Sequence, residues 1–123
     1  MQVIAIALGG AGGAVLRFWT STAVYSMLGR DFPWGTLVVN VLGSLLMGFL
    51  SVMLVERMTV GPEWRAAILV GFLGAFTTFS TFSLETLNLL EAGALFRALL
   101  NIGSSVLLCV TAAGMGLLIG RQL

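Results

Sequence analysis

Long apolar segments dominate the chain and are separated by short clusters of charged or turn-forming residues. Four segments are long enough for bilayer-spanning helices, which need about 20 mostly apolar residues. They cover residues 2–28, 34–55, 63–91 and 95–118, and Arg17 is the only charge inside the first. The pattern predicts an all-α integral membrane protein whose residues 1–123 form a single transmembrane domain.

The third segment differs from the others because its middle is polar. Residues 71–85 read Gly-Phe-Leu-Gly-Ala-Phe-Thr-Thr-Phe-Ser-Thr-Phe-Ser-Leu-Glu. Two glycines followed by the β-branched pair Thr77 and Thr78 make a weak helix. We therefore predict a helix break near residues 74–77. Such a break frees backbone carbonyls and N–H groups, which channels and transporters use to bind ions.

Helical spacing beyond the break sorts the side chains onto neighbouring faces. Phe76, Phe79 and Phe82 are three residues apart and are expected on one face. Hydroxyl and acidic side chains are expected on the adjacent face: Thr77, Ser80, Thr81, Glu85 and Asn88. A single hydroxyl often bonds its own helix, but five within residues 77–83 favour a path for a polar solute. Hydroxyls, amides and ring edges are donors that suit an anion.

Small and polar residues in the other spans indicate close helix contacts. Gly9 and Gly13 have the spacing that lets helix backbones approach. Arg17 costs roughly 2.5–3.5 kcal/mol at a helix centre, so we expect it to snorkel or to pair with a carboxylate or with carbonyls. Asn40 in the second span either links helices or faces a cavity, where its N–H donors suit an anion.

Composition and charge exclude several classes of function. Hydrophobic residues make up 59% of the chain and charged residues 9%, against about 25% charged in soluble domains. The chain has no His, which excludes a His-ligated metal site or a His-based catalytic triad. A net charge of +1 argues against a nucleic-acid partner.

The arginines give almost no orientation signal. With four spans, the N-terminal side collects three, at positions 57, 65 and 121, and the opposite side two, at positions 30 and 97. This difference is too small to fix one orientation under the positive-inside rule. Insertion both ways round and one weakly favoured orientation both remain open.

Three segments together resemble the Fluc/CrcB family of fluoride channels. They are residues 9–17 (Gly-Gly-Ala-Gly-Gly-Ala-Val-Leu-Arg), 35–40 (Gly-Thr-Leu-Val-Val-Asn) and 71–85, which match in order and spacing. The resemblance implies a multi-pass channel of the bacterial plasma membrane that exports fluoride passively and reduces its toxicity in the cytoplasm. It also implies an antiparallel, dual-topology homodimer in membrane lipid, with the third helix broken.

The resemblance also assigns roles to individual residues. The backbone carbonyls of Gly74 and Thr77 would bind a structural Na⁺ that is not transported and lies between two subunits. The residues that match the fluoride pathway are Asn40, Phe79, Phe82, Ser80, Thr81 and Ser105, and those that match structural or vestibule positions are Arg17 and Glu85. The chain departs from many members at Ala75, where they have a second glycine. On the fourth span Ser105 fits better than its neighbours Asn101 and Ser104.

Three other interpretations fit parts of the sequence. A small four-helix multidrug/proton antiporter has a similar length, but it would need a membrane-buried Glu in the first helix, where this chain has Arg17. A structural membrane subunit would confine polar residues to helix contacts, unlike the stripe from Thr77 to Glu85. An intramembrane enzyme would need a base for its serine, and without His or Lys none is obvious. We therefore predict that the chain is not an enzyme.

Overall fold

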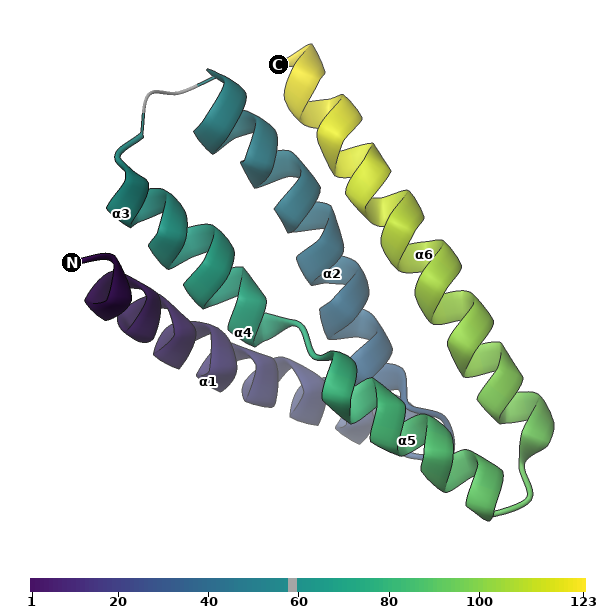
Figure 1. Cartoon of the computed structure of the whole chain (residues 1–123). Helices are drawn as coiled ribbons and strands as arrows, with labels where there is room; N and C mark the ends of the chain where they lie inside the picture. Colours follow the sequence, from purple (N-terminus) through teal and green to yellow (C-terminus); the bar gives the residue numbers. More distant parts are fainter. Residues whose placement is uncertain (58–59) are drawn as a thin grey trace.

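The computed structural model describes residues 1–57 and 60–123, and the regular structure in these ranges is helical (Figure 1). The first two spans are α1 (Gln2–Leu28) and α2 (Trp34–Ser51), the latter continued by the π-helical η1 (Val52–Arg57). The third span consists of α3 (Pro62–Arg65), the π-helical η2 (Ala66–Leu73), α4 (Gly74–Phe76) and α5 (Phe79–Glu91), and the last is α6 (Leu95–Gln122). The predicted connection between the second and third spans includes residues 58 and 59, which lie outside the described residues.

Within the described ranges, four helical segments are long and apolar enough to cross a membrane, which confirms the predicted all-α class with four spans. They are Gln2–Leu28, Trp34–Arg57, Pro62–Glu91 and Leu95–Gln122. Many of their large apolar side chains point outward; Met27 is 79% exposed and Phe96 75%. Such an apolar surface suits lipid, whose tails are as apolar as these side chains.

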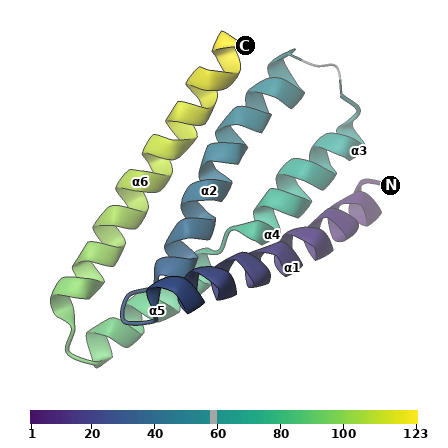
Figure 2. The same cartoon turned by 180° about the vertical axis from the view of Figure 1, so that it is seen from behind.

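The spans pack in two pairs, α2 with α6 and α1 with η2 (Figures 1 and 2). Glycines allow the α2 and α6 backbones to lie close together. A Cβ at Gly48 would overlap the Ala113 carbonyl, and a Cβ at Gly116 would overlap the Leu45 carbonyl. Both chain termini lie toward one end of the molecule, and the turns after α1 and α5 lie at the other.

Glycines also bring α1 against η2, as the spacing of Gly9 and Gly13 predicts. A Cβ at Gly9 would overlap the carbonyl of Ala67, and one at Gly13 the carbonyl of Phe72. Gly12, between them, would meet only the Phe72 ring, at 3.8 Å. The first half of the third span is therefore fixed on α1 by close backbone contact.

A short extended segment separates α4 from α5 (Figure 1). Thr77 has φ −88° and ψ 159°, and Thr78 has φ −150° and ψ 115°. The Thr78 side chain caps α5 by accepting a hydrogen bond from the Thr81 amide at 3.2 Å. Threonine is favoured both in extended backbone and at helix N-caps, so the local sequence accounts for the segment.

Candidate functional site

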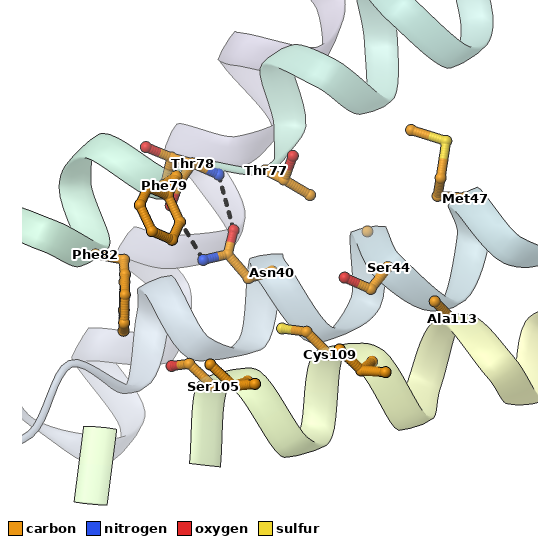
Figure 3. Close-up of a pocket in the computed structure, with 13 residues that line it drawn as sticks. Asn40, Ser44, Met47, Thr77, Thr78, Phe79, Phe82, Ser105, Cys109 and Ala113 are labelled. Atoms are coloured by element: carbon orange, nitrogen blue, oxygen red, sulfur yellow. Dashed lines mark hydrogen bonds between the residues drawn. The ribbon is translucent and has the colours of Figure 1, made fainter. Parts of the chain in front are cut away.

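Asn40 on α2 binds the extended segment with both ends of its side-chain amide (Figure 3). Its Oδ1 accepts from the Thr78 amide at 2.7 Å, and its Nδ2 donates to the Thr78 carbonyl at 3.1 Å. Gly43, one turn further along α2, leaves room for Thr77, because a Cβ there would overlap the Thr77 side chain. A side chain thus takes the place of the helical partners that Thr78 lacks.

Two carbonyls before and within the segment lose their helical donors. In a continuous α-helix the amides of residues 78 and 81 would bond the carbonyls of Gly74 and Thr77, four positions earlier. These amides donate instead to Asn40 Oδ1 and to Thr78 Oγ1. Backbone carbonyls are obligatory hydrogen-bonding groups, so this arrangement leaves two oxygens able to accept another partner.

Arg17 takes a third carbonyl in the same region. Its Nε donates to the Ala75 carbonyl at 2.9 Å, across 58 positions of sequence. Pairing with a carbonyl is one of the outcomes expected for a cation near the middle of a span. The arginine of α1 therefore satisfies backbone that the end of α4 leaves without a helical partner.

A groove of about 380 Å³ opens beside the extended segment, between α2, α5 and α6 (Figure 3). Four of the predicted pathway residues line it: Asn40, Phe79, Phe82 and Ser105. The Phe79 and Phe82 rings lie 5.3 Å apart and are tilted by 46°. Tilted rings present their positive edges as well as their faces. The groove residues are all uncharged, so it offers weak donors without a full positive charge.

The other predicted pathway residues lie outside this groove. Thr81 lines a separate cavity of about 240 Å³ together with Arg17 and Glu85. Ser80 is exposed, and its hydroxyl lies 3.4 Å from that of Thr78. Apart from the exposed Ser80, the predicted pathway residues are thus divided between a neutral groove and a charged cavity on either side of α5.

The expected stripe of three phenylalanines does not form. Phe76 lies before the extended segment, is 2% exposed and stacks parallel to Phe72 with ring centroids 6.4 Å apart. Only Phe79 and Phe82, both on α5, lie together in the groove. The prediction was wrong for Phe76 because the extended residues reset the helical phase, so spacing of three cannot be carried across them.

Buried polar side chains that the sequence did not single out join α5 to α6. Asn101, 1% exposed, donates from Nδ2 to Thr86 Oγ1 at 2.8 Å, and Thr86 donates to the Phe82 carbonyl at 2.8 Å. Ser105 donates to Asn101 Oδ1 at 3.4 Å. The chain of hydrogen bonds therefore ends at two residues of the groove, Phe82 and Ser105. The sequence shows that Thr86 and Asn101 are polar residues on two different spans. It does not show that the two helix faces meet.

A second unpredicted contact joins α1 to α5. The Tyr25 hydroxyl donates to Glu85 Oε2 at 2.8 Å and lies 3.4 Å from Thr36 Oγ1. Glu85 Oε1 is buried and has no hydrogen-bond partner among the described residues. The signal available in the sequence was that Tyr25 is the single tyrosine of the chain, within an apolar span.

Comparisons with known proteins agree with the motifs. A model of the CrcB-like protein family, described as Camphor Resistance (CrcB), matches residues 4–117. The chain is 59% identical over 123 residues to the fluoride-specific ion channel FluC of Methylococcus capsulatus, covering 100% of this chain and 54% of that protein. It is 60% identical over 121 residues to FluC of Magnetococcus marinus, covering 98% of each, and 51% identical over 124 residues to FluC of Coxiella burnetii, covering 100% of each.

These relatives are named as ion channels, not as enzymes or antiporters. The chain spans about half the length of the Methylococcus protein and nearly all of the other two. The family match covers the four predicted spans and includes the three segments that carry the resemblance. The chain therefore belongs to the CrcB family.

Proposed function

We propose that this protein is a fluoride-specific channel that lets fluoride leave the cytoplasm passively across the bacterial plasma membrane, which limits fluoride toxicity. The name shared by its relatives supports this activity, and family membership argues against the antiporter. The observation that carries the proposal is the neutral groove in which Asn40, the two tilted rings and Ser105 meet the extended Thr77–Thr78 segment. Such a lining binds an anion well enough to admit it and weakly enough to release it.

Fluoride would pass along the pathway residues Asn40, Phe79, Phe82, Ser80, Thr81 and Ser105. In this proposal the amide and the hydroxyls donate hydrogen bonds, and the ring edges of Phe79 and Phe82 supply partial positive charge. Arg17 and Glu85 belong to the vestibule, where the cavity beside α5 is charged. In this proposal the charged vestibule attracts the anion, and the pathway residues then let it pass.

The proposal includes a second copy of the chain, antiparallel to the first. Phe79 is 77% exposed in the single chain, so the groove has one open side that a partner would cover. The near-equal arginine count on the two sides supports insertion in both orientations. In this arrangement the interruption at Thr77 and Thr78 acts as the break of the third helix.

A structural Na⁺ would bind to the carbonyls of Gly74 and Thr77. Carbonyls of unwound membrane helices are oxygen ligands suited to Na⁺, and these two have lost their helical donors to Asn40 and Thr78. One chain offers only these two oxygens in the proposal, so the partner would supply their equivalents. The ion would hold the two broken helices together and would not be transported.

Fluoride efflux from liposomes tests the function. Vesicles that contain the purified full chain and potassium fluoride should release fluoride down its gradient, without a proton gradient, once a potassium ionophore balances the charge. Matched vesicles loaded with potassium chloride should retain chloride. Release that requires a pH gradient or an organic cation would favour the antiporter instead. The variant Phe82→Ile should fold but conduct less fluoride, and wild-type flux in this variant would remove the ring edge from the pathway.

Two further measurements test the assembly. Light scattering in detergent should give about twice the chain mass of 13.0 kDa, and a monomeric mass would contradict the dimer. Replacing Na⁺ by a larger inert cation during purification and assay should lower fluoride flux. Unchanged flux after thorough removal of Na⁺ would exclude the proposed metal site while leaving fluoride conduction intact.

A further inference from the structure

Two polar cavities meet at Tyr25 and Glu85, near the end of the molecule where α1 and α5 terminate. The break-side cavity, about 240 Å³, has Arg17 and Thr81 among its lining residues. The loop-side cavity, about 290 Å³, has Asp31 and Asn88 among its own. Tyr25, Arg30 and Glu85 line both cavities. These three side chains therefore form the wall between them.

The charges in this wall do not pair with each other. Arg17, Arg30 and Glu85 share the break-side cavity, yet within the described residues the one ion pair closer than 4.0 Å is Arg121 with Glu56, far along the chain. Opposite charges in a low-dielectric site attract strongly. In this structure Glu85 and Arg30 each contact Tyr25 instead, and Arg17 contacts the Ala75 carbonyl.

Tyr25 contacts two of these three charged side chains. Its hydroxyl donates to Glu85 Oε2 at 2.8 Å, a charge-assisted hydrogen bond. Its ring faces Arg30, whose Cζ lies 4.5 Å from the ring centroid, a cation–π distance. One side chain thus engages the anion with its tip and the cation with its face.

The Tyr25 ring is fixed in this position by the backbone of α2. A Cβ at Gly35 would overlap the ring edge, and it would lie 2.9 Å from the Ser21 carbonyl. Only glycine at position 35 therefore leaves room for the ring in this place. Thr36, the next residue, lies 3.4 Å from the hydroxyl, a longer contact than the one to Glu85.

We propose that Tyr25 is a positioning residue that holds Glu85 apart from Arg30 and Arg17, so that the carboxylate does not cancel the charge of either arginine and both attract a small anion toward the break-side cavity. This inference rests on the proposed fluoride channel function. Without the hydroxyl, the carboxylate turns toward a guanidinium group, and the resulting ion pair cancels the positive charge that faces the anion. The rings and hydroxyls of the groove itself stay in place.

Fluoride efflux at varied fluoride concentration tests this role. Tyr25→Phe should raise the concentration for half-maximal flux about tenfold, the scale of a hydrogen bond to a charged group, and should leave the maximal rate nearly unchanged. The matched control is Ser26→Ala, an exposed hydroxyl on the same turn. An unchanged concentration dependence, or a loss of maximal rate alone, would overturn the positioning role.

A spectroscopic measurement tests the contact without relying on transport. Because Tyr25 is the only tyrosine, labelling tyrosine with ¹³C at Cζ gives one phenol NMR signal. The signal should shift in Glu85→Gln and stay nearly constant in Ser26→Ala. A signal unaffected by Glu85→Gln overturns the inference even if the Phe variant fails to fold. If wild-type protein does not conduct fluoride, the channel function fails, and this signal still decides whether Tyr25 holds Glu85.

Discussion

The two halves of the third span are held by opposite means. The first half, η2 and α4, is fixed mainly by apolar packing and glycine contact, with one polar bond, from Arg17, at its end; Leu73 is 0% exposed and Phe76 2%, and Gly9 and Gly13 bring α1 against its backbone. The second half, α5, is held by single polar side chains, one each from α1, α2 and α6. These are Tyr25 on Glu85, Asn40 on Thr78, and Asn101 on Thr86.

This difference separates folding from positioning along one span. Tight packing tolerates little change in volume, so a substitution in the first half should disturb the fold. Each hydrogen bond in the second half fixes one point of α5, and its loss should shift a site residue more than it destabilises the chain. The largest effects on stability are therefore expected beside η2 and the sharpest effects on transport beside α5.

The strongest way to break the first half is Gly13→Val. The new side chain would overlap the Phe72 carbonyl, and overpacking costs about 1–3 kcal/mol or more. We expect a loss at the upper end of this range, because backbone atoms cannot move aside as a side chain can. Thermal unfolding in detergent measures it. Gly12→Ala, on the same helix, where a Cβ would make only ordinary contact with the Phe72 ring, is the control, and equal melting temperatures for the two variants would contradict close packing here.

A smaller loss of stability with a large loss of transport is expected for Asn40→Leu. The substitution removes both hydrogen bonds to Thr78, which are only partly buried, and each contributes about 0.5–1.5 kcal/mol. The start of α5 would loosen, and fluoride efflux should fall by at least an order of magnitude, about the effect of 1.4 kcal/mol. Ser83→Ala, an exposed hydroxyl on α5, should conduct normally. Normal flux in Asn40→Leu would mean that this amide does not position the segment.

The mildest effect is expected for Thr86→Val, which keeps the side-chain shape and removes the partner of Asn101. Hydrogen bonds between membrane helices contribute about 0.6 kcal/mol on average, so the melting temperature should fall only slightly. Fluoride flux should fall by a larger fraction than the melting temperature, because the same hydroxyl binds the Phe82 carbonyl beside the groove. Thr86→Ser should restore both. Failure of serine to rescue would assign the effect to packing.

Local sequence predicted the features that depend on local chemistry. Apolar length predicted four spans, and the glycine spacing at Gly9 and Gly13 predicted a backbone contact. The weak-helix run of glycines and threonines indicated where regular helix ends at Phe76. Two site residues chosen from the sequence, Asn40 and Ser105, line the same groove in the structure.

Features that depend on how different helices meet could not be predicted. Phe76 lies off the aromatic face because the extended residues reset the phase of α5. The contact of Tyr25 with Glu85 spans 60 positions and that of Asn101 with Thr86 spans 15. Neither pair has a sequence signature, since each depends on the rotation of two helices about their own axes. The division of pathway residues between a groove and a cavity follows from the same rotations.

The bond from Arg17 to the Ala75 carbonyl has a consequence for how the chain is made. Ribosomes produce α1 first, and its guanidinium group has no such acceptor until 58 further residues have been synthesised. That acceptor is freed only where α4 ends, because a continuous helix would use the carbonyl itself. An early α1 therefore carries an arginine that costs roughly 2.5–3.5 kcal/mol at the centre of a bilayer. We therefore expect the first helix to reach its full stability in the bilayer only after the third span has been inserted.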